Sequence, residues 1–517
     1  MKEKIVNLIA NHVEGMTAEE IATFIEIPPK QELGDYAFPC FRLAKTMHKA
    51  PNLIAADIKE AIGDIDFLDK IDVQGAYLNF FVKKNIFVQT MIESALKDNF
   101  GGSDEGADKV ICIDYSSPNV AKNFHVGHLR TTIIGNSLYK IYSKLGYKVI
   151  RINHLGDWGT QFGKLIVAYK NWGTKEAVEK DGVAELMRLY VKFHEEADQN
   201  PELVDEARAW FSKMEHGDEE ALSIWQWFKD ISLVEYKRTY DLLGMDFDYY
   251  LGESFYRDKC QEVVDQLTNA NLLKESEGAM IVDLSDYDMA PCIVTKKDGS
   301  SIYATRDLAA IFYRKNTYHF TKCLYVTGQE QKLHFAQVFK VVELLGNDWA
   351  KDSLVHIPYG LVSLEGAKLS TRSENIIYAE DILHDAIKKS FEIISEKSPN
   401  LPDKEEVAKI VGVGSVLFND LYNQRIKDVS FSWDKVLNFD GETGPYVQYT
   451  HARCSSVVRL AENFDPAKPV DYSTISEPDA MNLLKEISRF PKVVSDAAEK
   501  YERSEERRVG KECRSRW

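Results

Sequence analysis

Paired cysteines are missing from this chain. Its seven cysteines are scattered along 517 residues, and no two of them form a CxxC pair. The odd number argues against a disulfide framework, and the spacing argues against a structural zinc site. We therefore expect reduced thiols, a cytoplasmic protein and no metal ion held by its side chains.

Long apolar segments and an excess of basic charge are missing as well. No apolar run approaches the roughly 20 residues that cross a bilayer, and the N-terminus MKEKIVNLIANHVEG lacks the features of a signal peptide. Lys and Arg number 64 against 81 Asp and Glu, a net charge of −17. The sequence predicts no membrane contact. The acidic balance is only a weak argument against nucleic acid, because binding depends on where the basic groups lie.

Two glycine-rich phosphate motifs, GxxxxGK[ST] and GxGxxG, are also absent. Their backbone N–H groups hold phosphates in P-loop ATPases, in kinases and in dinucleotide dehydrogenases. These three classes are therefore disfavoured. A nucleotide, if one is bound, must be held by another arrangement.

Apolar residues make up 44% of the chain, enough for three or four domains. The first part, 1–105, has an amphipathic start, the loop PPKQELGDYAFPC, a helical stretch FRLAKTMHK and a strand-like AYLNFFV. The following GGSDEGAD indicates a linker. From Ala379 onward apolar residues recur at helical spacing, and further helices follow to about Tyr501. The last part is therefore predicted to be a helical bundle.

The middle part alternates strands and helices. VICIDYSS (110–117) and KVIRINH (148–154) are predicted strands around a helix from about Val126 to Leu145, which is the βαβ unit of a parallel sheet. The alternation resumes with CLYVTG (323–328), a helix from about Gln331 and LVHIPYG (354–360). Between them, residues 165–290 are mostly charged amphipathic helix, and Asp298 and Gly299 suit a hairpin turn. We interpret this stretch as an insertion that splits the sheet.

The sequence HVGH places His125 and His128 around Gly127, where a helix follows a strand and a turn. Unpaired backbone N–H groups and the positive end of the helix dipole favour an anion there. Two imidazoles would stabilise the charge that builds on phosphorus during in-line displacement, without acting as bases. The pattern predicts a nucleoside triphosphate as substrate. The alternative is two ordinary surface histidines beside a helix start.

A second candidate element is GAKLSTRS (366–373), directly after the last predicted strand. Lys368 and Arg372 on this loop of small residues would meet the β- and γ-phosphates as the leaving group departs. Most basic loops are simply solvated. The occurrence of this loop after HVGH, on the other half of the split sheet, favours the functional interpretation.

HVGH and KLSTR resemble the HIGH and KMSKS signatures of class I aminoacyl-tRNA synthetases. More closely, five stretches are similar to the arginyl-tRNA synthetase family: SSPNVAKNFHVGHLRTTIIGNSL, RINHLGDWGTQFGKLI, YATRDLAA, YVTGQEQKLHFAQVF and FDGETGPYVQYTHAR. The similarity runs from about Phe24 to about Tyr501. It covers nearly the whole chain, and its motifs are highly specific.

The resemblance implies an α/β fold in three parts. Residues 1–105 would be an α/β N-terminal added domain that contacts tRNA. Residues 106–375 would be a class I catalytic domain, a split Rossmann-type parallel sheet with the HxGH signature and an insertion at about 165–290. Residues 376–503 would be a helical bundle that binds the anticodon. The tail SEERRVGKECRSRW (504–517) departs from the family's ending, so we expect the last helices to be replaced and tRNA charging to be weak.

The resemblance also implies an arginine pocket and a set of catalytic side chains. Carboxylates suit the planar guanidinium fork and reject lysine by geometry. The positions that match the family's arginine-binding residues are Asp114, Asn119, Tyr303, Asp307 and Gln331. The matching catalytic residues are His125, His128, Lys122, Lys368 and Arg372. The matching ATP-binding residues are His125, Gly127, His128, Lys368, Leu369 and Ser370.

Two positions depart from the family pattern. Asp114 stands where many relatives carry glutamate, and Thr371 stands where the loop's second lysine is expected. Lys122 resembles the family lysine that compensates from the other wall of the site. Plainer alternatives stay open for several residues: a solvated Lys122, a core Tyr303, an Asp307 that complements a helix N-terminus, a Gln331 that starts a helix, a core Trp158 in the expected pocket wall NHLGDWGTQ, and core packing rather than base stacking for Tyr446 and Tyr449 near Arg453.

The implied reaction has two steps. The arginine carboxylate attacks the α-phosphate of ATP and pyrophosphate leaves. The 2′-OH of the terminal adenosine of tRNA(Arg) then takes arginine from arginyl-adenylate. Alignment and charge stabilisation supply the rate without an enzyme nucleophile, and Mg²⁺ would be held mainly by phosphates and water. The expected partners of this monomer are L-arginine, ATP and tRNA(Arg).

Two other classes stay open. A nucleotidylyltransferase of the same HxGH superfamily would use similar phosphate chemistry, but such enzymes are usually far shorter and lack the helical end. A non-catalytic tRNA-binding paralogue would have lost some of His125, His128, Asp307 and Lys368. All four are present.

Overall fold

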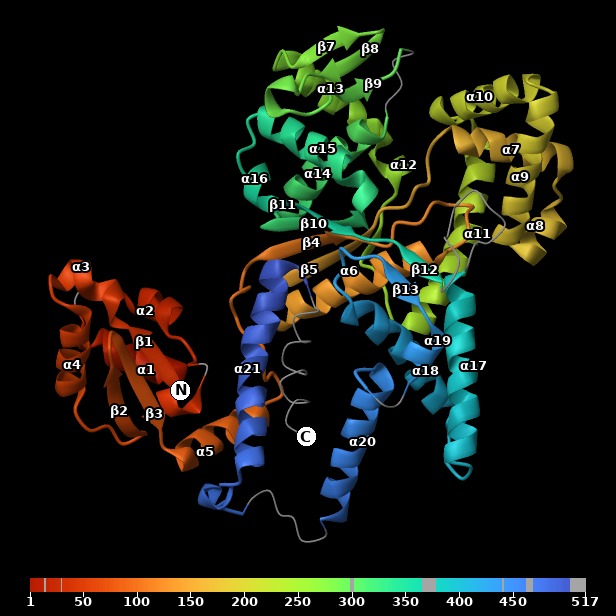
Figure 1. The fold of residues 1–517 in the computed structure, drawn as a ribbon. Coiled ribbons are helices and arrows are strands. Elements are labelled where there is room, and N and C mark those ends of the chain that lie inside the picture. Colours follow the sequence, from red (N-terminus) through yellow and green to blue (C-terminus); the bar gives the residue numbers. More distant parts are fainter. Residues whose placement is uncertain are drawn as a thin grey trace. The chain divides into compact units, whose positions relative to one another are not determined.

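The computed structural model describes residues 1–13, 15–28, 30–297, 302–364, 378–438, 441–461 and 468–502 (Figure 1). The chain divides into two compact units. The first comprises residues 1–101 and 463–492, and the second comprises 102–462 and 493–517. The sequence predicted a boundary near 105 but not the return of 463–492 to the first unit, because contacts between distant segments leave no local pattern.

The first unit is a three-stranded antiparallel sheet with helices. Its elements are α1 (Lys2–Ala10), α2 (Ala18–Phe24), β1 (Tyr36–Pro39), α3 (Ala44–Met47), α4 (Pro51–Ile62), β2 (Leu68–Gln74), β3 (Tyr77–Val82), α5 (Lys84–Ala95) and the part of α21 (Pro478–Lys500) up to Lys492. The strand order is β1-β3-β2. Strand β1 lies inside PPKQELGDYAFPC, which the sequence predicted to be a loop, because Tyr36 to Pro39 pair with β3.

The second unit contains the remaining elements. Around the main sheet these are β4 (Val110–Asp114), α6 (Val126–Lys144), β5 (Lys148–Asn153), β6 (Tyr249–Tyr250), α14 (Tyr303–Tyr318), β10 (Lys322–Gly328), α15 (Lys332–Leu344), α16 (Ala350–Ser353) and β11 (Leu354–Tyr359). The C-terminal segment of this unit adds β12 (Val362–Leu364), α17 (Ala379–Lys397), α18 (Lys404–Tyr422), β13 (Val429–Phe431), α19 (Trp433–Val436) and α20 (Gly444–Leu460).

The main sheet is parallel throughout, with strand order β11-β10-β4-β5-β6. From β4 the chain adds β5 and then β6 on one side, and it later adds β10 and β11 on the other side of β4. Ligands of such doubly wound sheets bind beyond the carboxyl ends of the strands, where the order reverses. The order reverses between β4 and β10, so the candidate site is expected at the carboxyl ends of these two strands.

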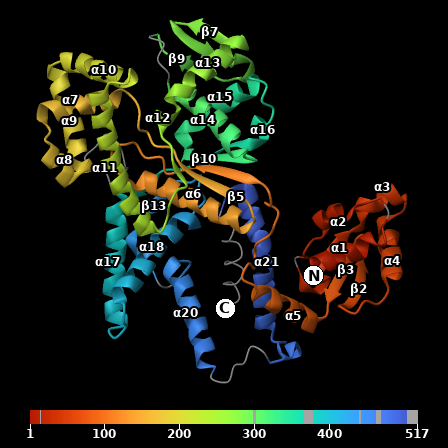
Figure 2. The ribbon, with the colours of Figure 1, turned by 180° about the vertical axis from the view of Figure 1, so that it is seen from behind.

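The sheet buries both faces because its side chains alternate. Ile111 and Ile113 of β4 pack with α6, while Cys112 faces the core formed with α14 and α15. Asp114, two residues after Cys112, shares that second face. The two views in Figures 1 and 2 show α6 on one side of the sheet and α14 and α15 on the other.

The predicted insertion is not separate from the sheet. It begins with the helices α7 (Thr160–Trp172), α8 (Lys175–Asp181), α9 (Val183–Gln199), α10 (Glu202–Glu215) and α11 (Glu219–Leu243), which bury a core of their own. Next comes β6, which pairs with β5 as the edge strand. A small antiparallel sheet follows, with α12 (Glu253–Tyr256), α13 (Cys260–Asn269), β7 (Leu273–Ser276), β8 (Ala279–Val282) and β9 (Cys292–Thr295). The predicted turn at Asp298 and Gly299 lies outside the described residues.

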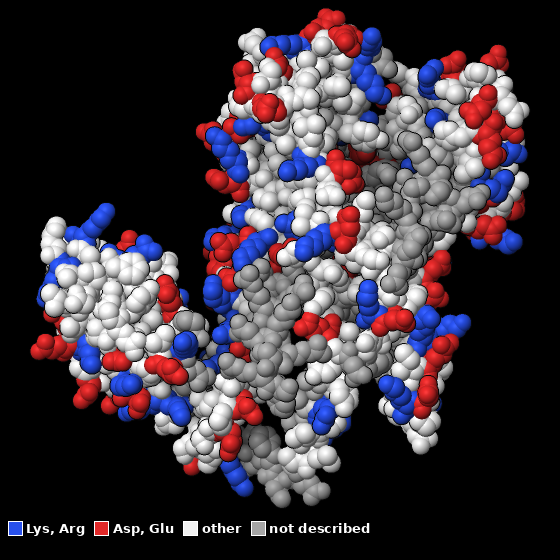
Figure 3. Space-filling model, viewed as in Figure 1, with Lys and Arg blue, Asp and Glu red and all other residues white. Residues whose placement is uncertain are grey.

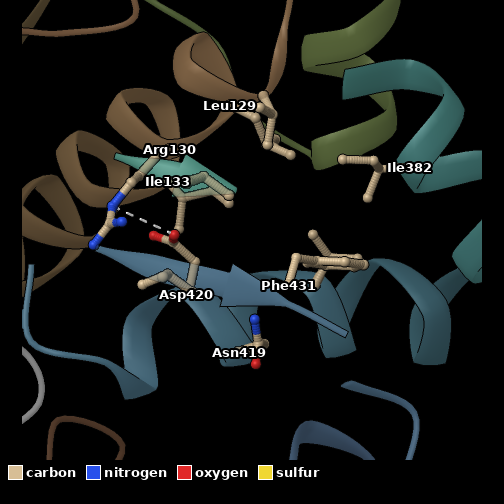
Figure 4. A pocket seen from close by; sticks show the side chains of 11 residues that line it. Leu129, Arg130, Ile133, Ile382, Asn419, Asp420 and Phe431 are labelled. Carbon is tan, nitrogen blue, oxygen red and sulfur yellow. Dashed lines mark ion pairs between the residues drawn. The ribbon is translucent and has the colours of Figure 1, made fainter. Parts of the chain in front are cut away.

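A buried arginine joins α6 to the chain after the sheet. Arg130 is 1% exposed and donates to the backbone oxygens of Leu361, Arg425 and Lys427 at 3.0–3.2 Å. Its Nε lies 3.6 Å from Oδ1 of Asp420 on α18 (Figure 4). Burial raises the pKa of Asp420 to about 6 although Arg130 lowers it. One guanidinium therefore holds the helix that follows HVGH against β12, α18 and the segment before β13.

The face of the molecule shown in Figure 3 carries both charges, and the described helices include no membrane span. In Figure 3 acidic and basic side chains intermingle over the helices of the α8–α11 region and around β7–β9. Among the helices that the structure describes, none has the length and apolar character needed to cross a bilayer. The net charge of −17 is thus not gathered into one acidic face in this view.

Candidate active site

The loop between β4 and α6 has an unusual backbone. Ser116, Ser117 and Ala121 have φ values of 71°, 45° and 60°, which non-glycine residues adopt only where the surroundings impose them. Helix α11 supplies those surroundings. Ser116 Oγ lies 2.7 Å from the hydroxyl of Tyr240, and Tyr236 Oη lies 2.7 Å from the backbone oxygen of Asn119. Hydrogen bonds from α11 therefore hold the loop in one conformation.

The two histidines of HVGH cap their own helix. Nδ1 of His125 accepts the backbone N–H of Gly127 at 3.0 Å, and Nδ1 of His128 accepts the backbone N–H of His125 at 3.3 Å. The rings stack with centroids 3.8 Å apart. A Cβ on Gly127 would lie 2.9 Å from Cε1 of His125, so only glycine leaves room for this ring. Because both Nδ1 atoms accept, each neutral ring carries its proton on Nε2.

Both imidazoles are neutral near pH 7. Burial, and then the charge of Lys122, lowers the pKa of His125. Burial lowers the pKa of His128 well below its usual value, and His125 and Lys122 lower it further. Two neutral Nε2–H donors beside an exposed lysine suit a bound phosphate, because they donate hydrogen bonds without needing a proton from solvent.

The carboxylate at the end of β4 is already paired. Oδ2 of Asp114 lies 2.8 Å from Nη2 of Arg314 on α14, and Oδ1 accepts the Ser117 hydroxyl at 2.9 Å. Arg314 is fully buried, and the same Nη2 donates to Nδ1 of His154 at 3.1 Å. An unpaired carboxylate would be costly here, so Arg314 balances the charge of Asp114.

Helices α14 and α15 bring further predicted residues to this side of the sheet. Tyr303 and Asp307 lie one helical turn apart on α14, as their spacing predicted. Tyr303 is 60% exposed, which excludes the alternative of a core tyrosine. Nε2 of His334 on α15 lies 2.6 Å from Oδ2 of Asp307. Gln331 is exposed and is the N-cap of α15.

His154 lies within electrostatic range of several carboxylates on this side of the sheet. Burial lowers its pKa, Asp114 raises it, Arg314 lowers it, and Asp307 and Asp157 raise it. Three carboxylates from three different segments therefore act on one imidazole. We call these three carboxylates the acidic region; the two that are buried, Asp114 and Asp157, are each paired with a cation.

The structure places most, but not all, of the predicted site residues. It brings Asp114 and Asp307 within electrostatic range of His154, and it puts Asn119 and Lys122, both exposed, on the loop that leads into HVGH. Lys368, Leu369, Ser370 and Arg372 lie outside the described residues. The described chain resumes at Tyr378, which forms a β-bridge with His125.

The segment NHLGDWGTQ, predicted to line the pocket, is largely structural. Asp157 is fully buried and accepts from Lys229 and from the hydroxyl of Ser254, each at 2.7 Å. Trp158 is 2% exposed and packs edge-on against Phe211 and Trp225. The core alternative for Trp158 is therefore confirmed.

Sequence reasoning missed Arg314 and His334. Arg314 follows Asp307 by seven residues, two helical turns, and comes directly after the apolar run LAAIFY. A cation at that place on an otherwise buried helix is the signal that could have found it. His334 follows Gln331 by one turn, but a single histidine on an amphipathic helix carries no signal of its partner.

No metal site is found among the described residues, which contain no cluster of three His, Cys, Asp or Glu side chains arranged to bind a metal ion. The carboxylates at the strand ends are instead paired with Arg314, His334 and Lys229.

Comparisons with known proteins agree along nearly the whole chain. Three family models match: "tRNA synthetases class I (R), catalytic domain" at residues 91–433, "Arginyl tRNA synthetase N terminal domain" at 2–82, and "DALR anticodon binding domain" at 447–505. The chain belongs to the arginyl-tRNA synthetase family. The nucleotidylyltransferase alternative is thereby excluded.

Curated relatives of this synthetase family are highly similar. The chain is 55% identical over 505 residues to the arginine–tRNA ligase of Alkaliphilus metalliredigens, covering 97% of this chain and 89% of that protein. It is 54% identical over 503 residues to the arginine–tRNA ligase of Clostridioides difficile, covering 97% and 88%. Solved arginyl-tRNA synthetases from Thermus thermophilus and Plasmodium falciparum share the fold, with TM-scores of 0.79 and 0.74 at 23% and 22% identity. They cover 97% and 96% of this chain, and 88% of each of those chains.

Proposed function

We propose that the chain activates L-arginine with ATP and transfers it to tRNA(Arg), the reaction for which its curated relatives are named. The observation that carries this function is the identity of 55% over 97% of the chain. The site is compatible with the reaction, because it joins neutral phosphate-binding donors to a nearby acidic region. The same reaction makes the chain a ligase of protein synthesis.

The HVGH histidines are proposed to hold the triphosphate. Their Nε2–H groups would donate to phosphate oxygens as the arginine carboxylate attacks the α-phosphate and pyrophosphate leaves. Lys122 would approach the phosphates from the same loop. Lys368 and Arg372, with Leu369 and Ser370 beside the nucleotide, are assigned from the sequence alone. Mg²⁺ is proposed to enter with ATP as part of the substrate.

The acidic region is proposed to hold arginine. Asp307 and Tyr303 would receive the guanidinium, since a carboxylate and a phenol oxygen on one helical face match its donors. Gln331 would hold the α-amino group, and Asn119 would line the pocket. Asp114 would act through the lone pairs that Arg314 and Ser117 leave available, because a carboxylate accepts about four hydrogen bonds.

The remaining parts of the chain are proposed to bind tRNA. Residues 1–105 would contact the body of tRNA(Arg), and the helical segment 376–503 would contact the anticodon, where the exposed Tyr446 and Tyr449 can stack on bases. We further propose that the protein is a monomer in the cytoplasm. The DALR match at 447–505 supports the anticodon role.

Pyrophosphate exchange across the twenty amino acids, with tRNA present, tests the proposal. Only arginine is expected to support exchange. The Asp307→Asn variant should raise the KM for arginine at least tenfold, because a neutral amide replaces the charge that faces the guanidinium, while the KM for ATP stays unchanged. Asp385→Asn, at an exposed carboxylate on α17, is the matched control. Exchange with another amino acid, or an unaffected Asp307→Asn enzyme, would contradict the proposal.

A further inference from the structure

The contact between His334 and Asp307 raises a question about the arginine pocket. An aspartate on a helix has two free side-chain torsions, whereas a two-pronged contact with a guanidinium needs the carboxylate plane in one orientation. In this structure Nε2 of His334 lies 2.6 Å from Oδ2 of Asp307. Because a carboxylate only accepts, Nε2 carries the proton and donates it. One oxygen of Asp307 is therefore held from outside its own helix.

His334 is itself held in place by the core beneath it. The next residue, Phe335, is 4% exposed and lies between the ring of Tyr325 at 5.1 Å and the ring of His356 at 4.9 Å. The His334 ring packs edge-on against Phe335, with centroids 5.3 Å apart. The donor that meets Asp307 thus belongs to a segment packed on β10 and β11.

Both side chains remain open to a ligand. The side chain of His334 is 30% exposed and that of Asp307 is 21% exposed. The histidine occupies Oδ2 only, so Oδ1 and one lone pair of Oδ2 are left for a substrate.

We propose that His334 is a positioning residue of the arginine pocket, which orients the carboxylate of Asp307 for the substrate guanidinium through its Nε2–H donor. This inference rests on the proposed function, in which Asp307 binds arginine. His334 does not touch the reacting atoms, and its effect is on arginine affinity alone.

Two substitutions separate the donor from the ring. His334→Phe keeps a ring against Phe335 and removes the N–H donor. His334→Gln places an amide N–H near the position of Nε2 and restores it. The matched control is His384→Gln on α17, where Nε2 lies 3.5 Å from Oε1 of Glu380 on an exposed surface.

Titration calorimetry of the full chain, with L-arginine and separately with ATP, gives the measurement. We expect His334→Phe to raise the Kd for arginine about tenfold, because the variant loses one charge-assisted hydrogen bond and the alignment of the carboxylate that this bond provides. We expect His334→Gln to recover most of that loss, and all three variants to bind ATP as the parent chain does. A normal arginine Kd in His334→Phe, a parallel loss of ATP binding, or no rescue by glutamine would each overturn the inference.

The Asp307→Asn variant, titrated in parallel, separates this inference from the proposed function. If Asp307→Asn keeps its arginine affinity, the assignment of Asp307 is wrong and the role of His334 falls with it. If Asp307→Asn loses affinity and His334→Phe does not, only the positioning role is wrong. The double variant should bind arginine no more weakly than Asp307→Asn alone, because the histidine acts through that carboxylate. An additive loss would contradict the proposal.

Discussion

The phosphate side and the amino-acid side of the candidate site are held in different ways. His125 and His128 are fixed by backbone N–H groups within their own helix turn. Asp114 and Asp307 are fixed by side chains from other positions in the fold, Arg314 and His334. Neutral donors can be oriented locally, whereas buried or half-buried carboxylates need a partner for their charge. The comparison teaches that contacts within one helix turn orient the histidines, whereas contacts between distant segments orient the carboxylates.

The largest expected effect comes from removing the partner of Asp114. Arg314→Met leaves a carboxylate that is 6% exposed without its cation, and we expect a loss of about 3–5 kcal/mol in the free energy of unfolding. Urea unfolding followed by far-UV circular dichroism measures it. Arg208→Met is the control: Arg208 pairs with Asp205 on α10, and the two side chains are 70% and 76% exposed, so its loss should stay below about 1 kcal/mol. Equal losses of unfolding free energy in the two variants would contradict the idea that the buried carboxylate depends on its cation.

A smaller effect is expected on the local side. Gly127→Ala places a Cβ 2.9 Å from Cε1 and 3.0 Å from Nδ1 of His125, so the ring must move away from its capping position. Alanine also favours the helix by up to about 1 kcal/mol. We therefore expect pyrophosphate exchange to fall about tenfold while the thermal midpoint holds or rises. If the exchange rate instead stays at the parent level while the thermal midpoint holds or rises, the position of the histidine ring does not matter for the reaction.

The smallest effect concerns acid stability on the tertiary side. Burial lowers the pKa of His356 to about 4, and its Nε2 lies 2.8 Å from the hydroxyl of Thr327. The unfolded chain takes up the proton first, so the stability present above pH 6.5 is lost as the pH falls toward 4. Between pH 7.5 and 5 we expect the parent chain to lose about 1 kcal/mol more than His356→Gln, after allowance for the partial exposure of the ring. Urea titrations at both pH values measure the two losses. An equal loss in the parent chain and in His356→Gln would contradict this prediction.

The comparison also explains what the sequence could predict. The strands β4, β5, β10 and β11 and the helix after HVGH follow local patterns and were predicted closely. The sequence HVGH was singled out for the same reason, since a helix start with two histidines is visible in four letters. Its role in binding phosphate stays a prediction. Strand β6 was missed because two residues at a sheet edge carry no periodicity. Arg314 and His334 were missed because a partner across the fold leaves no mark in the local sequence.

Arg130 has a consequence for how this protein can be divided. Its three backbone acceptors, at Leu361, Arg425 and Lys427, lie beyond the last strand of the main sheet. A fragment that ends after β11 would keep the guanidinium group of Arg130 and lose the three backbone carbonyls that accept its hydrogen bonds. A fragment that satisfies this side chain therefore has to extend at least through Lys427, and it includes α17 and α18 beyond the edge of the main sheet.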